Sequence, residues 1–127
     1  MKAYIQVINL SHEMLVMRPN LLELAVNAKA VNSKLFSLPR VLIMSALQEL
    51  QGESATFREL KIGLGLNDGV LYANLKVLGK MGYIEEKGVR LGNEEMTSYR
   101  ITRHGLEDFA ALRAWLERWG GGHGKPE

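Results

Sequence analysis

Histidine, serine and acidic residues could support catalysis or bind a metal, but the sequence brings few of them together. The three histidines, His12, His104 and His123, are far apart, and only His104 can share a helix face with an acid, Asp108, at i, i+4. One such pair does not make a metal site. Cysteine is absent, which excludes a disulfide framework, a thiolate zinc site and a cysteine nucleophile.

The known catalytic motifs are also missing. The sequence contains no nucleophile elbow, no phosphate-cradling glycine loop and no paired metal carboxylates. The pairs Glu85-Glu86 and Glu94-Glu95 are adjacent residues, which face opposite sides of a strand. We therefore predict a protein that is not an enzyme and that has no catalytic residues, no metal and no cofactor.

Composition indicates an ordinary globular chain. The 127 residues are 46% hydrophobic and 24% charged, which is enough to form a core and typical of one folded domain. No apolar run approaches the length of a membrane span, and the first residues do not resemble a signal peptide, so we expect a cytoplasmic protein without membrane contact. The net charge of +2 permits an anionic partner without requiring one.

Helix start and stop signals are dense in the middle of the chain. Pro39 fits the first turn of a helix that ends near Gly52. Thr56 and Glu59 form a capping box for a short helix, Phe57–Ile62. Gly65 can adopt the positive φ of a tight turn. Asn67-Asp68 then caps a helix that runs to about Met81 and is closed by Gly82.

Strand patterns follow these helices. Residues 83–87 and 98–102 read as strands, and the polar stretch Gly88–Thr97 reads as a long loop between them. A last helix begins at Thr102 or Arg103 and runs through Trp119.

The two ends are less regular. Residues 2–10 fit a strand or a helix about equally well. Asn20 can cap a helix over Leu21–Val31, which is apolar around much of its girth and needs more than one packing partner. The glycine-rich residues 120–127 are expected to form a flexible tail.

This order of elements predicts a winged helix-turn-helix: mainly α with a small β-hairpin (α+β), and extra helices at both ends for dimerisation. The helix after Asn67 fits a DNA-recognition helix, because Leu71, Leu75 and Leu78 form one buried stripe. Gly69, Ala73, Lys76 and Lys80 fall on the opposite face, which stays free for the major groove.

Four sequence blocks carry a family resemblance. They are residues 39–47, 57–61, 66–78 and 82–84, and residues 98–105 more loosely fit the close of a wing. In their order and spacing they resemble the MarR/ArsR-type winged helix-turn-helix transcriptional regulators, over roughly Leu38 to Gly105. The resemblance implies a homodimer that binds double-stranded DNA at a two-fold site as a transcription regulator. It assigns no small-molecule effector.

The resemblance also implies which residues contact DNA. The recognition-helix candidates are Asn67, Asp68, Gly69, Val70, Tyr72, Ala73, Asn74 and Lys76; Arg58 and Lys61 would lie near phosphates, and Arg90 in the wing, residues 88–97. The chain departs from the family in its wing, where Glu94 and Glu95 would repel phosphate.

Apolar residues in the end helices exceed what one small core needs, and they predict the dimer interface. The candidate contacts are Leu21, Leu24, Ala28, Leu112, Trp115, Leu116 and Trp119. The expected organisation is an N-terminal extension over 1–37, the winged helix-turn-helix over 38–105, a dimerisation helix over 106–119 and the tail.

Other roles remain open for several of these residues. Lys76 and Lys80 could simply solvate a helix face, and Tyr72 could pack against a neighbour or a dimer seam. The two tryptophans could stack on a ligand. The whole domain could instead dock onto another protein without reading DNA, because the fold alone does not decide between these functions.

Overall fold

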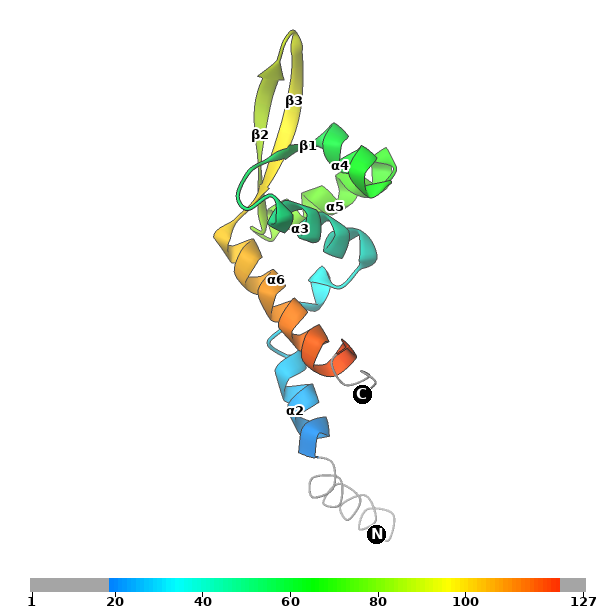
Figure 1. Ribbon diagram of the computed structural model, residues 1–127, viewed down its shortest axis with the longest axis vertical. Helices are drawn as coiled ribbons and strands as arrows, with labels where there is room; N and C mark the ends of the chain where they lie inside the picture. The colour runs from blue at the N-terminus through cyan, green and yellow to red at the C-terminus, as the bar shows by residue number, and fades with distance from the viewer. Residues whose placement is uncertain (1–18, 122–127) are drawn as a thin grey trace. The chain divides into compact units, whose positions relative to one another are not determined.

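The structure is a computed structural model that describes residues 19–121 (Figure 1). The chain divides into two compact units: Asn32–Leu112 forms one, and the described residues 19–31 and 113–121 belong to the other. The first unit is therefore longer at both ends than the predicted 38–105 segment. The predicted strand or helix at 2–10 lies outside the described residues.

Three of the helices in Asn32–Leu112 precede the long hairpin, and two of them have the predicted N-caps. They are α3 (Leu38–Glu49), α4 (Phe57–Leu64) and α5 (Asp68–Lys80). The Thr56–Glu59 capping box is confirmed, and the backbone N–H of Val70 donates to Oδ1 of Asn67 over 2.8 Å. Helix α3 begins at Leu38 and is capped by Ser37, with Pro39 in its first turn.

A tight turn joins α4 to α5. Gly65 has φ +66°, in the left-handed region, and its N–H donates to the carbonyl of Lys61 over 3.0 Å. A glycine takes this conformation without steric cost, so the chain can reverse within three residues and enter α5 at Asn67. The helix-turn-helix predicted from the sequence is thus confirmed.

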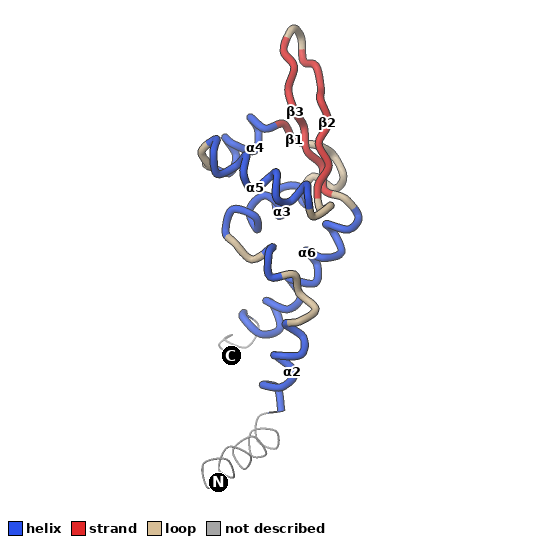
Figure 2. The backbone as a smooth tube through the Cα atoms, turned by 180° about the vertical axis from the view of Figure 1, so that it is seen from behind, coloured by secondary structure: helices blue, strands red, loops and turns tan. Residues whose placement is uncertain are grey.

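The sheet has three strands, one more than predicted. Strands β1 (Ala55–Thr56), β2 (Ile84–Leu91) and β3 (Glu94–Ile101) are antiparallel in the order β1-β3-β2 (Figure 2). The prediction of a long loop over Gly88–Thr97 is wrong, because Leu91 pairs with Glu94 and only Gly92 and Asn93 lie between them. No residue in the outer half of this hairpin is buried, so the alternation of buried and exposed residues that marks a strand is weak there.

The core of this unit lies between α3, α5, the sheet and the first part of α6 (Arg103–Leu116). It consists mainly of leucines and aromatic residues: Leu35, Ile43, Met44, Leu47, Leu60, Leu71, Leu75, Leu78, Tyr83, Ile84, Tyr99, Ile101, Phe109 and Leu112. Leu112 has no exposed surface, which corrects its assignment as a dimer contact: its side chain fills the core and offers nothing to a partner.

The remaining elements are helical. A 3-10 turn, η1 (Ser33–Leu35), precedes α3. Helix α2 spans Pro19–Ala28, so it includes Pro19 and Asn20 and ends three residues before the predicted Val31. The five residues Glu117–Gly121 form a π-helical turn, so Gly120 and Gly121 belong to a helical element and not to the predicted tail.

Within the smaller unit, the carboxylate of Glu23 on α2 pairs with the guanidinium of Arg118. That guanidinium also lies 4.8 Å from the ring centroid of Trp119. Large apolar side chains stay exposed on α2, with Leu22 54% and Val26 58% exposed. In the part of the chain that the structure describes, no helix is long and apolar enough to cross a membrane.

Candidate nucleic-acid interface

The outer face of α5 is exposed along its length. Tyr72 is 55% exposed, and Gly69, Val70, Ala73 and Lys76 are exposed with it. The opposite face carries Leu71, Leu75 and Leu78, which are buried in the core. The predicted division of this helix into a buried and a free face is therefore confirmed, and the free face has small residues where a nucleic-acid backbone could approach closely.

Polar groups at the start of α5 already take part in hydrogen bonds and ion pairs within the protein. Asn67 uses Oδ1 to cap the helix, so its amide nitrogen is the group left to donate to a ligand. The Asp68 carboxylate pairs with Nζ of Lys61 on α4 over 2.9 Å, and both side chains are exposed. A phosphate near Lys61 would thus compete with Asp68 for the same ammonium group.

Asn74 is held by two bonds within the protein. Its Oδ1 accepts from Nε of Arg40 over 2.8 Å, and its Nδ2 donates to the carbonyl of Val70 over 2.8 Å. Arg40 also donates from Nη1 to the carbonyl of Lys34 over 2.6 Å. Arg40 was not predicted as a site residue, since it lies 34 residues from Asn74 and nothing local signals the contact. Base contact by Asn74 would require breaking this link.

Lys76 on α5 faces strand β2 of the sheet. Its Nζ is 3.5 Å from Oε1 of Glu86 on β2 and 5.1 Å from the centroid of the Tyr72 ring. Both members of the ion pair are about half exposed, so water screens the attraction and the pair contributes little to stability. Lys76 can therefore exchange its carboxylate for a phosphate at small cost.

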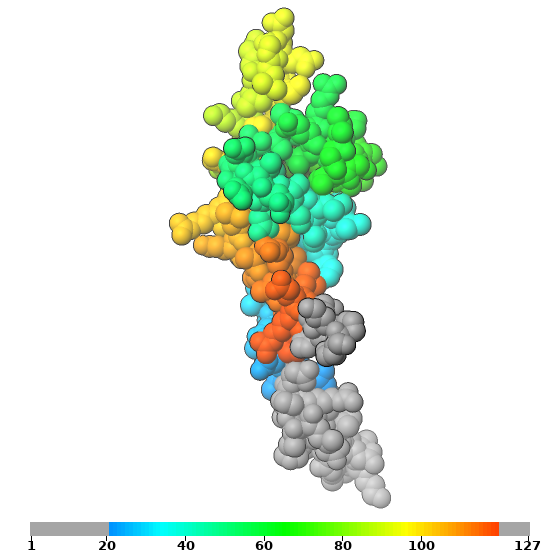
Figure 3. Space-filling model, viewed as in Figure 1, coloured from blue at the N-terminus to red at the C-terminus, as the bar shows by residue number. Residues whose placement is uncertain are grey.

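The wing, strands β2 and β3, extends past α4 and α5 in the space-filling view (Figure 3, yellow beyond green). Nη2 of Arg90 lies 3.4 Å from Oε2 of Glu95, and Arg100 pairs with Glu85 lower on the hairpin. Leu91 beside the turn is 57% exposed. The arginine predicted to touch backbone in the wing thus already has a cross-strand acidic partner.

The predicted site residues therefore fall into two groups. Those on the free face of α5 and its approach lie together: Arg58, Lys61, Asn67, Asp68, Gly69, Val70, Tyr72, Ala73 and Lys76 are all exposed on α4 or α5 or at the cap. Arg90 lies apart from them on the wing, and Asn74 is half-buried behind them. Among the described residues, no cluster of three or more histidine, aspartate or glutamate side chains could hold a metal ion.

The core of the larger unit contains two buried tyrosines, Tyr83 and Tyr99. Burial raises the pKa of Tyr83 above its ordinary value of 10.0, as does its hydrogen bond to Asp108, although its bond from Asn32 acts in the opposite direction. Burial also raises the pKa of Tyr99, and the nearby charges of Glu86 and Tyr72 raise it further. Both phenols thus hold their protons more tightly in the folded state.

We expect these two tyrosines to make the fold sensitive to alkali. Unfolded tyrosine loses its proton near pH 10, before the folded state does, so their contribution is fully present below about pH 10 and declines as pH rises further. Urea unfolding measured between about pH 8 and about pH 11 should show this decline. It should be shallower in a variant with Tyr83→Phe and Tyr99→Phe, and an equal decline in the variant would contradict the assignment.

Comparisons with known proteins agree with this geometry. The sequence profile of the winged helix DNA-binding domain family matches residues 40–119. A transcriptional regulator homologue from Pyrococcus horikoshii OT3 is similar in structure, with a TM-score of 0.64 and 24% identity over 77% of this chain and 96% of that one. No curated protein matches the chain in sequence.

Two further solved structures share the fold. The PcaV transcriptional regulator from Streptomyces coelicolor, solved with its natural ligand, has a TM-score of 0.57 and 20% identity, over 82% of this chain and 71% of that one. Diamide-treated YodB from B. subtilis has a TM-score of 0.56 and 20% identity, over 68% and 86%. Because the family profile covers α3 to α6 and the structure contains every part of the fold, the chain belongs to the winged helix DNA-binding domain family.

Proposed function

We propose that the protein binds double-stranded DNA as a homodimeric transcription regulator, with α5 in the major groove and the wing near the backbone. The observation that carries the proposal is the free face of α5, exposed opposite a fully buried leucine stripe. A helix that enters the major groove needs such a face, held at a fixed angle by a preceding helix and turn. On this proposal the protein works in the cytoplasm, where bacterial and archaeal DNA is found.

The charges on this surface determine what kind of binding to expect. Lys61, Lys76 and Arg90 each have a carboxylate within 4 Å, from Asp68, Glu86 and Glu95 respectively. Each carboxylate lies where a DNA phosphate would repel it. Few phosphates are then neutralised for each protein bound, so non-specific affinity should be weak and should change little with salt.

The ion pair of Lys76 gives a direct test. Lys76→Ala should weaken binding to duplexes of any sequence by roughly tenfold at low salt, since it removes a charge-assisted phosphate contact. Glu86→Gln should tighten binding several-fold, because it frees Lys76 and removes a repulsive charge. Fluorescence anisotropy with a labelled duplex of random sequence, titrated at several salt concentrations, measures both effects.

Lys87→Ala is the matched control. It changes the net charge as Lys76→Ala does, but successive strand residues face opposite sides, so Lys87 points away from the side of β2 that carries Glu86. If Lys87→Ala weakens binding as much as Lys76→Ala, only net charge matters and this face is not the reader. Absence of binding by the unaltered protein even at low salt would refute the proposed function.

Apolar surface on the end helices supports the homodimer. Leu22 and Val26 are more than half exposed on α2. Six of the predicted dimer contacts are each partly exposed: Leu21, Leu24, Ala28, Trp115, Leu116 and Trp119. Self-association would bury this surface, and most soluble oligomers are closed two-fold dimers. Sedimentation equilibrium gives the mass, and selection from a random DNA pool should recover sites with two-fold symmetry.

One observation favours a second candidate function. Both arginines of the wing, Arg90 and Arg100, are paired with acids of the neighbouring strand, so their positive charges are already partly compensated. A winged helix that docks onto another protein would have no need of a basic wing. The anisotropy titration separates the two candidates, since only the DNA-binding protein responds to random duplex.

A further inference from the structure

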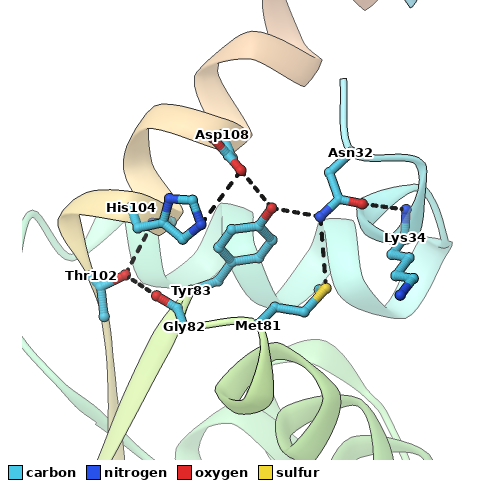
Figure 4. A network of polar contacts seen from close by, with 9 residues as sticks. Asn32, Lys34, Met81, Gly82, Tyr83, Thr102, His104 and Asp108 are labelled. Carbon is cyan, nitrogen blue, oxygen red and sulfur yellow. Dashed lines mark hydrogen bonds and ion pairs between the residues drawn. The ribbon is translucent and has the colours of Figure 1, made fainter. Parts of the chain in front are cut away.

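A chain of hydrogen bonds centred on Tyr83 crosses the larger unit (Figure 4). The Tyr83 hydroxyl donates to Oδ2 of Asp108 over 2.6 Å and accepts from Nδ2 of Asn32 over 2.7 Å. Oδ1 of Asn32 accepts from the backbone N–H of Lys34 over 2.9 Å. These bonds join three segments that are distant in sequence: the turn before α3, the residue that precedes β2, and helix α6.

The directions of these bonds are mutually consistent. An ionised carboxylate only accepts, so the Tyr83 proton must lie toward Asp108. The hydroxyl oxygen then needs a donor, which the amide nitrogen of Asn32 supplies. The other end of that amide accepts from Lys34, so a flipped amide would lose both bonds. Each member thus has one arrangement that satisfies all its neighbours.

Tyr83 itself is fixed on both sides. It is 1% exposed, its N–H donates to the carbonyl of Leu78 in the last turn of α5, and its own carbonyl accepts from the N–H of Thr102 over 2.9 Å. The imidazole of His104 packs on its ring at 4.8 Å between centroids, and lies 3.7 Å from Asp108. The hydroxyl is therefore held rigidly with respect to the end of the recognition helix.

The network lies close to both points where the chain passes from one compact unit to the other. The chain passes between its two compact units twice, after Val31 and after Leu112. Asn32 is the first residue after one crossing, and Asp108 lies four residues, about one helical turn, before the other. One connection therefore begins at a residue bonded to the Tyr83 hydroxyl, and the other begins about one helical turn after a second such residue.

We propose that Tyr83 is a positioning residue, which ties both chain connections between the units to the end of recognition helix α5. This inference rests on the proposed function. If the smaller unit forms the dimer, rigid connections set the separation of the two recognition helices. A dimer reads half-sites about one DNA turn, roughly 34 Å, apart, so the hydroxyl would determine which half-site spacing the dimer accepts.

Tyr83→Phe tests the proposal, because it removes only the hydroxyl. We expect its affinity for a duplex with two half-sites, recovered by selection from a random pool, to fall about tenfold, since a loosened dimer loses effective concentration at the second half-site. Its affinity for a duplex with one half-site should stay within about twofold of the unaltered protein. When the spacing of the two half-sites is changed by one or two base pairs, the affinity of Tyr83→Phe should fall less than that of the unaltered protein.

Tyr99→Phe is the matched control, since it removes the same atom from another buried tyrosine outside this network. It should leave both affinities and the spacing preference unchanged. An unchanged two-site affinity for Tyr83→Phe would overturn the proposal. An equal loss on one-site and two-site duplexes would overturn it too, because the damage would then lie in the DNA-reading unit itself.

A measurement without DNA separates this proposal from the proposed function. The chain has no cysteine, so spin labels at the exposed positions Lys29→Cys and Glu53→Cys would report one distance between the units, with excess unlabelled protein to isolate single chains. Tyr83→Phe should broaden the distance distribution, and Tyr99→Phe should not. If the protein binds no DNA, only the proposed function is refuted. The role of Tyr83 in holding the chain connections would be refuted by a distance distribution that Tyr83→Phe leaves unchanged.

Discussion

Replacing Gly105 with alanine is expected to lower the free energy of unfolding by about 3 kcal/mol, because the backbone leaves no room for a methyl group. A Cβ atom at this position would lie 2.2 Å from the carbonyl oxygen of Tyr83 and 3.0 Å from Cγ1 of Ile101. That carbonyl is already bonded to the N–H of Thr102, so it cannot move aside without breaking the bond that joins β2 to the start of α6. Urea unfolding followed by circular dichroism measures the loss.

Gly79→Ala is the control for this prediction. Gly79 lies inside α5, and a Cβ there would meet no atom within 4 Å. Alanine favours the helix over glycine by roughly 1 kcal/mol, so this variant should be as stable as the unaltered protein or slightly more stable. A Gly105→Ala variant that unfolds within about 1 kcal/mol of the unaltered protein would show that the helix start can shift, contrary to the tight contact described.

The neighbouring residues Leu71 and Tyr72 should respond in opposite ways. Leu71 is fully buried, and Leu71→Ala should cost about 3 kcal/mol through lost apolar contact and the cavity that remains. Tyr72 is 55% exposed, so Tyr72→Ala should change stability by about 1 kcal/mol or less. On the proposed function it should instead weaken DNA binding, because it removes the exposed ring that lies beside Lys76.

Each variant serves as the control for the other. Leu71→Ala should retain its affinity for DNA when measured at a temperature where it remains folded, since its side chain never reaches the surface. Equal stability losses for the two variants would mean that α5 is rotated from the orientation described. Unchanged DNA affinity in Tyr72→Ala would leave the tyrosine as a packing residue, one of the alternatives that the sequence left open.

The sequence predicted best those features that depend on neighbouring residues. The Thr56–Glu59 capping box, the turn at Gly65 and the cap at Asn67 need only side chains within a few positions of one another, and all three are confirmed. The leucine stripe of α5 was equally clear, because a helical period places its three leucines on one face.

Contacts between distant residues were beyond the reach of the sequence. Nothing near Asn74 indicates that Arg40 holds it, and nothing near Lys76 indicates Glu86. The outer half of the hairpin was mistaken for a loop because none of its residues is buried, so pairing by backbone hydrogen bonds leaves little trace in the side-chain pattern. Leu112 looked like interface because the sequence records that a residue is apolar but not which surface covers it.

The hairpin's position at the margin of the sheet has a consequence for solubility. Strand β2 ends the order β1-β3-β2, so among the described residues its outer edge has no neighbouring strand, and its N–H and C=O groups could template the addition of a strand from another molecule. Glu85, Glu86, Lys87 and Arg90 lie along that edge, and charged side chains discourage such pairing. Variants that lose these acids to gain affinity for DNA would therefore be more prone to aggregate.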